Sequence, residues 1–252
     1  MLIHPRAPLA SRRENPFALR RDAVARRSGE KGEKYEAILN AAIKVFAEAG
    51  YHGAQVSRIA REAGVADGTI YLYFSGKSDL LVSVFRSYLS RHVERLRTAL
   101  AEEPDVPAKL RRLVWEHFRP LSEHYELAVV TQVELRQADP ALRGRINEIL
   151  RSYLDVIDGL IEEGKGAGIF RRDIETHLMR KMIFGTLDET VTSWVMARRR
   201  RELMRLADPV FRLLYTGLKA PEAEPGGAER DERSGAERRS QDEDHRPHEA
   251  DV

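Results

Sequence analysis

The sequence contains no cysteine, so it offers neither a disulfide framework nor a thiolate metal site. No apolar run approaches the ~18 residues that a membrane-spanning helix needs, and the charged N-terminus lacks the apolar segment of a secretory signal. These absences fit a reducing cytoplasm, and we expect a cytoplasmic protein with no membrane partner. Nucleophile-elbow motifs, Gly-rich phosphate loops and metal-spaced sets of His, Asp and Glu are missing as well. We therefore expect no enzyme activity, no metal and no cofactor.

Charge of one sign is also scarce overall, because the net charge of the 252 residues is only +2. Its distribution is uneven, however. Residues 1–31 hold eight Arg and Lys against three Asp and Glu, whereas residues 220–252 hold five Arg against eleven Asp and Glu. Both segments have too few large apolar residues to order themselves by burial. We predict a disordered basic tail over residues 1–32 and a disordered acidic tail over residues 219–252.

Between the tails, apolar residues recur every three or four positions, and no segment alternates apolar and polar residues as a strand would. The pattern predicts an all-α protein of about nine helices. Pro104 and Pro107 interrupt it, and we expect an N-terminal domain over residues 33–93 and a C-terminal domain over residues 94–218. The predicted helices are 35–49, two short helices within 55–74, then 77–100, 110–121, 127–135, 142–163, 175–196 and 202–217.

The two short helices within residues 55–74 are joined by a tight turn. Gly64 stands where the first helix must end, and a glycine can adopt the left-handed conformation that such an end requires. Val65 follows as the hydrophobic contact that closes the turn. This spacing predicts a helix-turn-helix, whose second helix can enter the major groove of DNA. An ordinary hairpin of two helices would fit the same short pattern. The flanking sequence decides between the two interpretations.

Residues 35–93 resemble the DNA-binding domain of the TetR family of bacterial transcriptional regulators. The matching segments are AEAGYHG at the end of the first helix and IAREAGVADGTIYLYFSGKSDLL after it. EEGKGAGIFRRDI is similar to the family's link between its seventh and eighth helices. The resemblance implies that three helices read DNA and that the fourth joins them to a helical ligand-binding and dimerisation domain.

The resemblance also implies which residues approach DNA. Hydroxyl groups can bond phosphates or base edges, a lysine supplies a cation, and a glycine allows close approach. Tyr71 is a better candidate than Tyr73, which could pack in the core instead. Gln55 replaces the family's usual Ser or Thr cap before the first short helix. Ala66 replaces the common Ser cap before the second, where Asp67 is a possible substitute cap. We expect Ser75 to cap the long helix that follows. The predicted DNA-binding residues are Ser57, Arg58, Asp67, Gly68, Thr69, Tyr71, Tyr73 and Lys77.

The similarity continues through HFRPLSEHYELAVVTQVELRQ, LRGRINEILRSYLDVIDGLIEEG and MRKMIFGTLDETVTSWVM, and points to a branch of the family that represses fatty-acid degradation genes until long-chain acyl-CoA releases it. An acyl chain needs an apolar tunnel, and CoA phosphates need cations. Arg111, Arg112, Arg119, Arg143 and Arg145 could supply these cations, or could form solvated faces. Ordinary core packing is the competing interpretation of the apolar tunnel candidates, and the polar ones could bond each other. The predicted ligand-binding residues are Trp115, Phe118, Gln132, Val133, Arg136, Ile149, Tyr153, Ile157, Ile183, Phe184, Leu187 and Asp188.

The last two helices carry more apolar surface than one buried face requires. We expect them to pack on the same helices of a second copy, so that the homodimer reads an inverted-repeat DNA operator. Two other hypotheses remain open. The protein could respond to another hydrophobic effector, such as a drug or a free fatty acid. It could also be an enzyme acting on acyl-CoA, although the absent catalytic motifs argue against that.

Overall fold

Helices account for nearly all the regular structure in the computed structural model, which describes residues 16–136, 139–198 and 202–221, with side chains from residue 31 onward. The described residues contain no named strand, only an isolated bridge between Phe170 and Lys219. None of the described helices is long and apolar enough to cross a membrane. The helices are α1 (Pro16–Gly53), α2 (Val56–Glu62), α3 (Asp67–Ile70), α4 (Lys77–Ala101), α5 (Val106–Glu123), α6 (Tyr125–Glu134), α7 (Pro140–Gly166), α8 (Thr176–Met196), the 3₁₀ helix η1 (Leu203–Leu206) and α9 (Ala207–Leu218).

The first helix starts earlier than the sequence predicts. α1 begins at Pro16, so residues 16–32 are helical rather than part of a disordered tail. Proline is favourable at a first helical position, and the Ala and Arg residues that follow are strong helix formers. Residues 1–15 and 222–252, which make up most of the predicted tails, lie outside the described residues. At its other end α1 changes direction at Gly50, where φ is 67° and ψ is 165°. Helical geometry therefore breaks directly after residue 49, where the sequence predicts the end of the first helix.

The predicted turn between the two short helices is also confirmed. Gly64 has φ +67°, and the amide of Val65 donates to the carbonyl of Ala60 at 3.0 Å. This bond closes the turn that ends α2. The second helix is shorter than predicted, because α3 ends at Ile70 and the chain continues to Phe74 as a turn.

Two capping predictions are wrong. Ala66 is the N-cap of α3 and no side chain bonds there, because Asp67 already lies inside the first helical turn. Gly76, rather than Ser75, is the N-cap of α4. Ser75 contributes through its backbone, whose amide donates to Oδ2 of Asp79 at 3.1 Å. A carboxylate in the first turn of α4 therefore reaches back to the residue before the cap.

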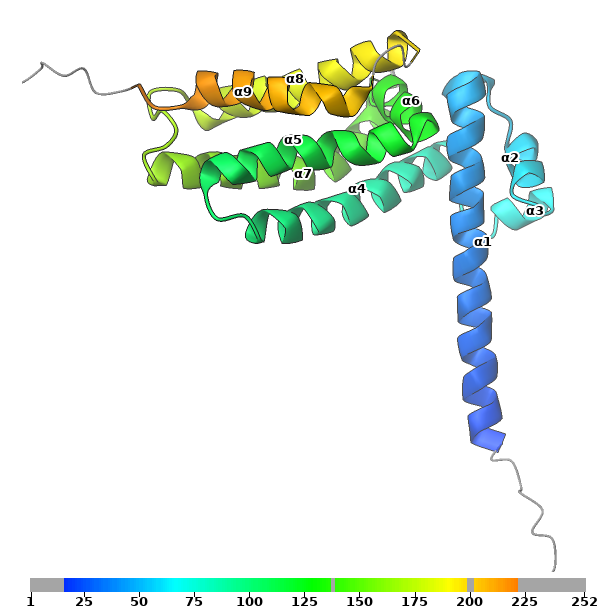
Figure 1. The fold of residues 1–252 in the computed structure, drawn as a ribbon. Coiled ribbons are helices and arrows are strands. Elements are labelled where there is room, and N and C mark those ends of the chain that lie inside the picture. Colours follow the sequence, from blue (N-terminus) through cyan, green and yellow to red (C-terminus); the bar gives the residue numbers. More distant parts are fainter. Residues whose placement is uncertain (1–15, 137–138, 199–201, 222–252) are drawn as a thin grey trace, which may run out of the picture.

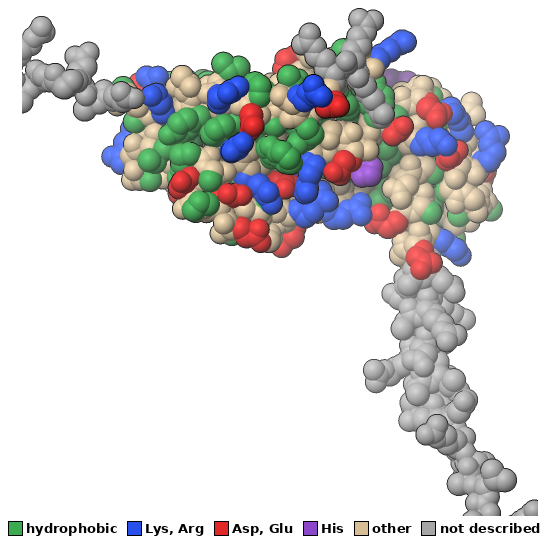
Figure 2. All heavy atoms as spheres, viewed as in Figure 1, with side chains coloured by type: hydrophobic (Ala, Val, Ile, Leu, Met, Phe, Trp, Pro, Cys, Tyr) green, Lys and Arg blue, Asp and Glu red, His purple; other side chains and the backbone are tan. Residues whose placement is uncertain are grey.

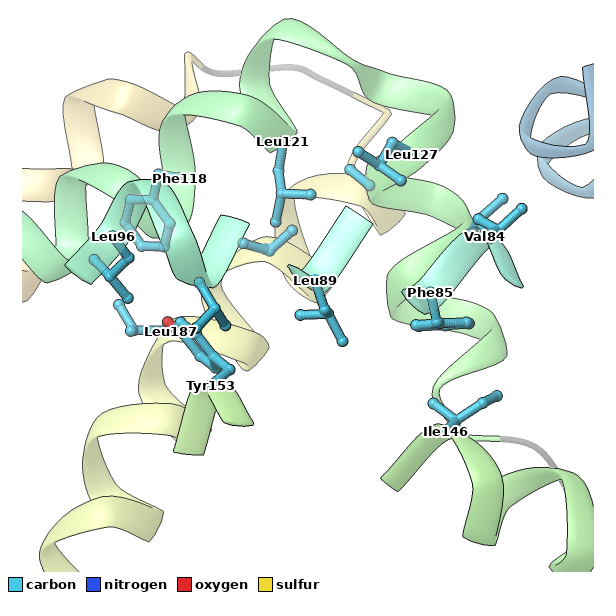
Figure 3. Packing of buried hydrophobic residues seen from close by; sticks show 14 of the residues in the cluster. Val84, Phe85, Leu89, Leu96, Phe118, Leu121, Leu127, Ile146, Tyr153 and Leu187 are labelled. Atoms are coloured by element: carbon cyan, nitrogen blue, oxygen red, sulfur yellow. The ribbon is translucent and has the colours of Figure 1, made fainter. Parts of the chain in front are cut away.

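One helix joins the two halves of the molecule. α1, α2 and α3 form the unit at one end, and α4 leaves it to run along the layer formed by α5 and α7 (Figure 1). α8 and α9 pack on the far side of that layer. Side chains from α4, α5, α6, α7 and α8 converge in the core (Figure 3). The all-α prediction is confirmed.

The outer surface of the last two helices keeps several large apolar side chains. Ile183, Leu187 and Val191 of α8 are buried in the core of their own chain. Other positions of α8 and α9 face solvent, and Figure 2 shows hydrophobic side chains exposed over this domain. The exposed hydrophobic residues on these two helices are Leu178, Met182, Met196 and Leu213.

Candidate DNA-reading surface and effector cavity

The helix-turn-helix presents a small exposed surface around α3. Ser57, Asp67 and Gly68 are exposed, while Thr69 is half-buried beside the buried Ile70. Arg58 forms an ion pair with Glu48 of α1, which holds α2 against α1. Of this group, Ser57, Asp67 and Gly68 are open to a partner.

The two tyrosines of the turn after α3 have different surroundings. Tyr71 is 59% exposed, whereas Tyr73 is half-buried, with its ring centroid 6.3 Å from those of Tyr35 and Phe74. Between them lies Leu72, which is 82% exposed and which the sequence reasoning missed. An apolar side chain so exposed beside a tyrosine suits contact with a thymine methyl group. The signal available in the sequence was that Leu72 is apolar and has no predicted apolar partner within the helix-turn-helix.

Lys77 attaches the start of α4 to the unit formed by α1, α2 and α3, which we call the reader. Its Nζ donates to the carbonyls of His52 at 3.0 Å and Ala54 at 3.1 Å, and it lies 4.8 Å from the ring centroid of Tyr51. The backbone amide of Tyr51 in turn donates to Oε1 of Glu134 at 2.8 Å. Glu134 is a buried residue of α6. The end of α1 and the link that follows it are therefore bonded to both α4 and α6.

A small cavity of about 40 Å³ lies among α4, α5, α6, α7 and α8. Four of the predicted ligand-binding residues line it: Gln132, Tyr153, Phe184 and Asp188. The rest of the wall is mostly apolar and aromatic. It consists of Phe85, Tyr88, Leu89, His92, His117, Leu121, Thr131, Leu135 and Leu150.

The other predicted ligand residues lie elsewhere. Trp115 is 41% exposed in a surface groove beside Phe211, and Val133 is 43% exposed on the outer side of α6. Both are apolar residues of a helix, but each occupies the outward face of that helix. Ile149 is half-buried against the core. Four more are fully buried in the surrounding core without lining the cavity: Phe118, Ile157, Ile183 and Leu187.

The polar residues Gln132, Arg136 and Asp188 bond one another. Nη2 of Arg136 lies 2.6 Å from Oδ2 of Asp188, and Nη1 donates to the carbonyl of Gln132 at 2.7 Å. With its nitrogen turned toward α8, the Gln132 amide donates to Oδ1 of Asp188 at 2.9 Å. Burial is the main cause that raises the pKa of Asp188, and Arg136 opposes it. The cluster ties α6 to α8.

Sequence reasoning missed a second polar cluster in the cavity wall. Nδ1 of His117 lies 2.7 Å from Oη of Tyr153, and the ring of His92 packs between those of Tyr88 and Tyr153. Burial lowers the pKa of His92 to about 4 and that of His117 to about 3, so both rings are neutral at pH 7. Burial also raises the pKa values of Tyr88 and Tyr153. The signal available in the sequence was that His92 lies within the apolar stripe of its helix, where a polar side chain needs a partner.

A wider cleft of about 460 Å³ separates α1 from α4 and from the junction of α5 and α6. Lys44, Arg91 and Arg95 line it together with Glu123 and Glu126, and Tyr88 belongs to both this cleft and the cavity. Four of the arginines proposed from sequence as CoA ligands are instead engaged in ion pairs. Arg111 pairs with Asp208, Arg112 and Arg119 with Glu116, and Arg145 with Asp79.

A helix-turn-helix joined by one long helix to a helical domain with a small cavity among its helices defines a DNA-binding regulator with its own sensor domain. Residues 38–84 match the sequence profile of the bacterial regulatory proteins of the tetR family, and residues 85–217 match that of the YsiA-like protein C-terminal region. The chain belongs to the TetR family of transcriptional regulators.

Similar proteins include regulators of fatty-acid metabolism. The fatty acid metabolism regulator protein of Bacillus subtilis is 46% identical over 189 residues, which are 75% of this chain and 97% of that protein. The fatty acid degradation regulator FadR of Bacillus halodurans is 50% identical, with a TM-score of 0.71, over 73% of this chain and all of that one. The structure of FadR from B. subtilis in complex with stearoyl-CoA is 46% identical and also has a TM-score of 0.71, over 73% of this chain and 99% of that one.

Proposed function

We propose that this protein represses fatty-acid degradation genes, binding an inverted-repeat operator as a homodimer and leaving it when long-chain acyl-CoA binds. The observation that carries the proposal is the double role of α4. Its first residue, Lys77, is bonded to the reader, and Phe85, Tyr88, Leu89 and His92 line the cavity. A rigid helix that belongs to both sites transmits a change at one to the other.

The size of the cavity explains how an effector would move α4. Ligand pockets typically measure about 300–1,000 Å³, against about 40 Å³ here. A long acyl chain therefore requires the surrounding helices to separate. Such a ligand binds only the expanded state, and so it shifts the population toward that state. The operator binds the state in which the helices around the cavity remain closely packed.

The adjoining cleft supplies the cations that a CoA ester needs. Arg91 and Arg95 lie one turn apart on α4, and Lys44 lines the same cleft from α1. Lys44 pairs with Glu62 and Arg91 with Glu36, so a CoA phosphate would replace these partly exposed carboxylates. Guanidinium groups bind phosphates in a bidentate manner. An acyl-CoA with its chain in the cavity and its phosphates in this cleft would pass Tyr88, which borders both spaces.

Dimerisation is supported by the exposed apolar residues on α8 and α9, which a second copy would cover. Two readers separated by about 34 Å fit successive major grooves on one side of the DNA. At each half-site we expect Gly68 to allow close approach, with Tyr71 and Thr69 supplying hydroxyl groups. Leu72 adds an apolar contact. Lys77, whose bonds lie within the protein, would orient the reader and supply positive charge near the backbone.

The test is a titration of the protein–operator complex, followed by fluorescence anisotropy at fixed salt. The ligands are acyl-CoAs from C12 to C18, the matching free fatty acids, and CoA alone. We expect release by the acyl-CoAs only. Release by the free acids as well would favour a different hydrophobic effector, and failure to bind any inverted-repeat operator would overturn the proposal.

A further inference from the structure

Four polar rings form a continuous row within the apolar core. The centroid of His92 lies 5.6 Å from that of Tyr88 and 5.4 Å from that of Tyr153, and the centroid of Tyr153 lies 5.7 Å from that of His117. The rings come from α4, α5 and α7, and all four line the cavity. Figure 3 shows Tyr153 among the packed apolar side chains.

Two nitrogen atoms of this row have no hydrogen-bond partner among the described residues. They are Nδ1 of His92 and Nε2 of His117. The two residues are only 2% and 8% exposed, so water in the bulk does not reach them freely. An unpaired buried polar group destabilises the folded state and requires an explanation. Both residues border the cavity, so a ligand there could supply the missing partner.

The protons on His117 and Tyr153 define what kind of partner fits. A neutral imidazole carries one N–H, and a phenol carries one O–H. If Tyr153 donates to Nδ1 of His117, then Nε2–H remains free to donate. If Nδ1–H donates to Tyr153 instead, the phenol hydrogen remains. In either arrangement the pair keeps one donor, at Nε2 of His117 or at the phenol of Tyr153, and an acceptor on the ligand would satisfy that donor. In the second arrangement Nε2 is left as an acceptor.

We propose that His117 and Tyr153 donate a hydrogen bond to the carbonyl oxygen of the effector's acyl thioester. This inference rests on the proposed function. The saturated hydrocarbon chain has no acceptor, whereas the carbonyl joins the chain to the CoA moiety. The polar row begins at Tyr88, on the border with the cationic cleft. The carbonyl would therefore reach the row while the phosphates stay near Arg91 and Arg95.

The donor makes the protein selective for the thioester group, which can be tested with one pair of ligands. Stearoyl-CoA and S-octadecyl-CoA have the same chain length and the same CoA moiety, and the second lacks only the carbonyl oxygen. We expect the wild-type protein to be released from its operator, and to be stabilised in a thermal-shift assay, at about tenfold lower concentrations of the thioester. A tenfold preference is the size expected for one buried hydrogen bond.

The variants locate the donor. The double variant His117→Phe/Tyr153→Phe keeps both aromatic rings and removes both donors, so the two ligands should act at equal concentrations. His177→Phe, at an exposed position of α8, is the matched control and should behave as wild type. Thermal melts establish that each variant is folded.

The outcomes separate this inference from the proposed function. Equal potency of the two ligands on the wild-type protein would overturn the inference and leave the proposed function standing. A preference for the thioester that survives in the double variant would overturn the assignment to His117 and Tyr153. Failure of both ligands to release the operator would overturn the proposed function, and this inference with it.

Discussion

At the scale of single residues, Gly68 separates the needs of folding from those of DNA binding. It lies in α3, and a Cβ added there would meet no other atom within 4 Å. Gly68→Ala should therefore leave the free energy of unfolding unchanged or raise it by up to about 1 kcal/mol, because alanine favours the helix. Operator affinity should fall about tenfold, because the added methyl group would collide with the DNA.

Chemical denaturation and operator binding by anisotropy measure the two effects. Gly144→Ala is the matched control, since Gly144 is a helical glycine of α7 that also has open space around it. It should gain similar stability and keep its operator affinity. An unchanged affinity in Gly68→Ala would show that the backbone of α3 does not approach DNA closely.

The buried histidines should make the folded protein sensitive to acid. In the unfolded chain they take up protons near pH 6.5, whereas the folded chain holds the pKa values of His92 and His117 at about 4 and about 3. Unfolding therefore takes up protons as the pH falls below 6.5, and stability decreases in that direction. The environment of the rings supports this direction, because Tyr88 and Tyr153 pack against them and the charge of Arg95 further lowers the pKa of His92.

His117→Phe removes one of these protonations. Between pH 7 and pH 4.5 the variant should lose roughly 2 kcal/mol less stability than the wild type. Urea denaturation at each pH measures the loss, and the comparison concerns the slope rather than the stability at pH 7. His177→Phe, whose ring is exposed, should follow the wild-type slope. Parallel slopes for His117→Phe and wild type would contradict the prediction.

At the scale of helices, α6 connects the cavity to the reader independently of α4. Thr131, Gln132 and Leu135 of this segment line the cavity, while Glu134 accepts the amide hydrogen of Tyr51 in the reader. Glu134→Ala removes that acceptor, so a displacement of α6 would pass to the reader less completely. The ratio of operator affinities without and with stearoyl-CoA should fall about tenfold, which lies within the usual range of allosteric coupling.

The measurement is operator binding at zero and at saturating stearoyl-CoA. The free energy of unfolding should also fall, by about 1–3 kcal/mol, because a buried hydrogen bond is lost. Glu148→Ala, at an exposed position of α7, is the control and should change neither quantity. Full coupling in Glu134→Ala would assign transmission to α4 alone.

At the scale of the whole molecule, the apolar residues of α8 and α9 bear on the assembly. Leu213 is 72% exposed in the single chain, so Leu213→Glu should leave the folded protomer intact. In a dimer formed through α9 it would bury a charge, which is unfavourable without a partner. Sedimentation should then show a monomer, and operator affinity should fall at least about 100-fold because the two half-sites are no longer bound together.

The control for the oligomeric state is Leu72→Glu, which changes a leucine that is 82% exposed on the reader. It should keep the mass of the dimer while weakening operator binding by another route. A Leu213→Glu protein that remains dimeric would place the interface elsewhere on the molecule.

Local features were predictable because they depend on near neighbours in the chain. Apolar spacing gave the helix order, and a glycine placed correctly for the turn gave the end of α2. The boundaries were less certain where weak local preferences compete, as at Ser75 and Gly76. The start of α1 was missed because charge and low hydrophobicity suggested disorder, while residues 16–32 have good helix propensity.

The sequence by itself determined the all-α class, the helix-turn-helix and membership of the TetR family, since each rests on residue spacing over short distances. Only the tertiary structure decided which apolar residues line the cavity, because periodicity shows that a helix has a buried face without showing what that face meets. It also brought His92, His117 and Tyr153 together from three helices. Their joint chemistry depends on packing between helices distant in sequence, and no local pattern records it.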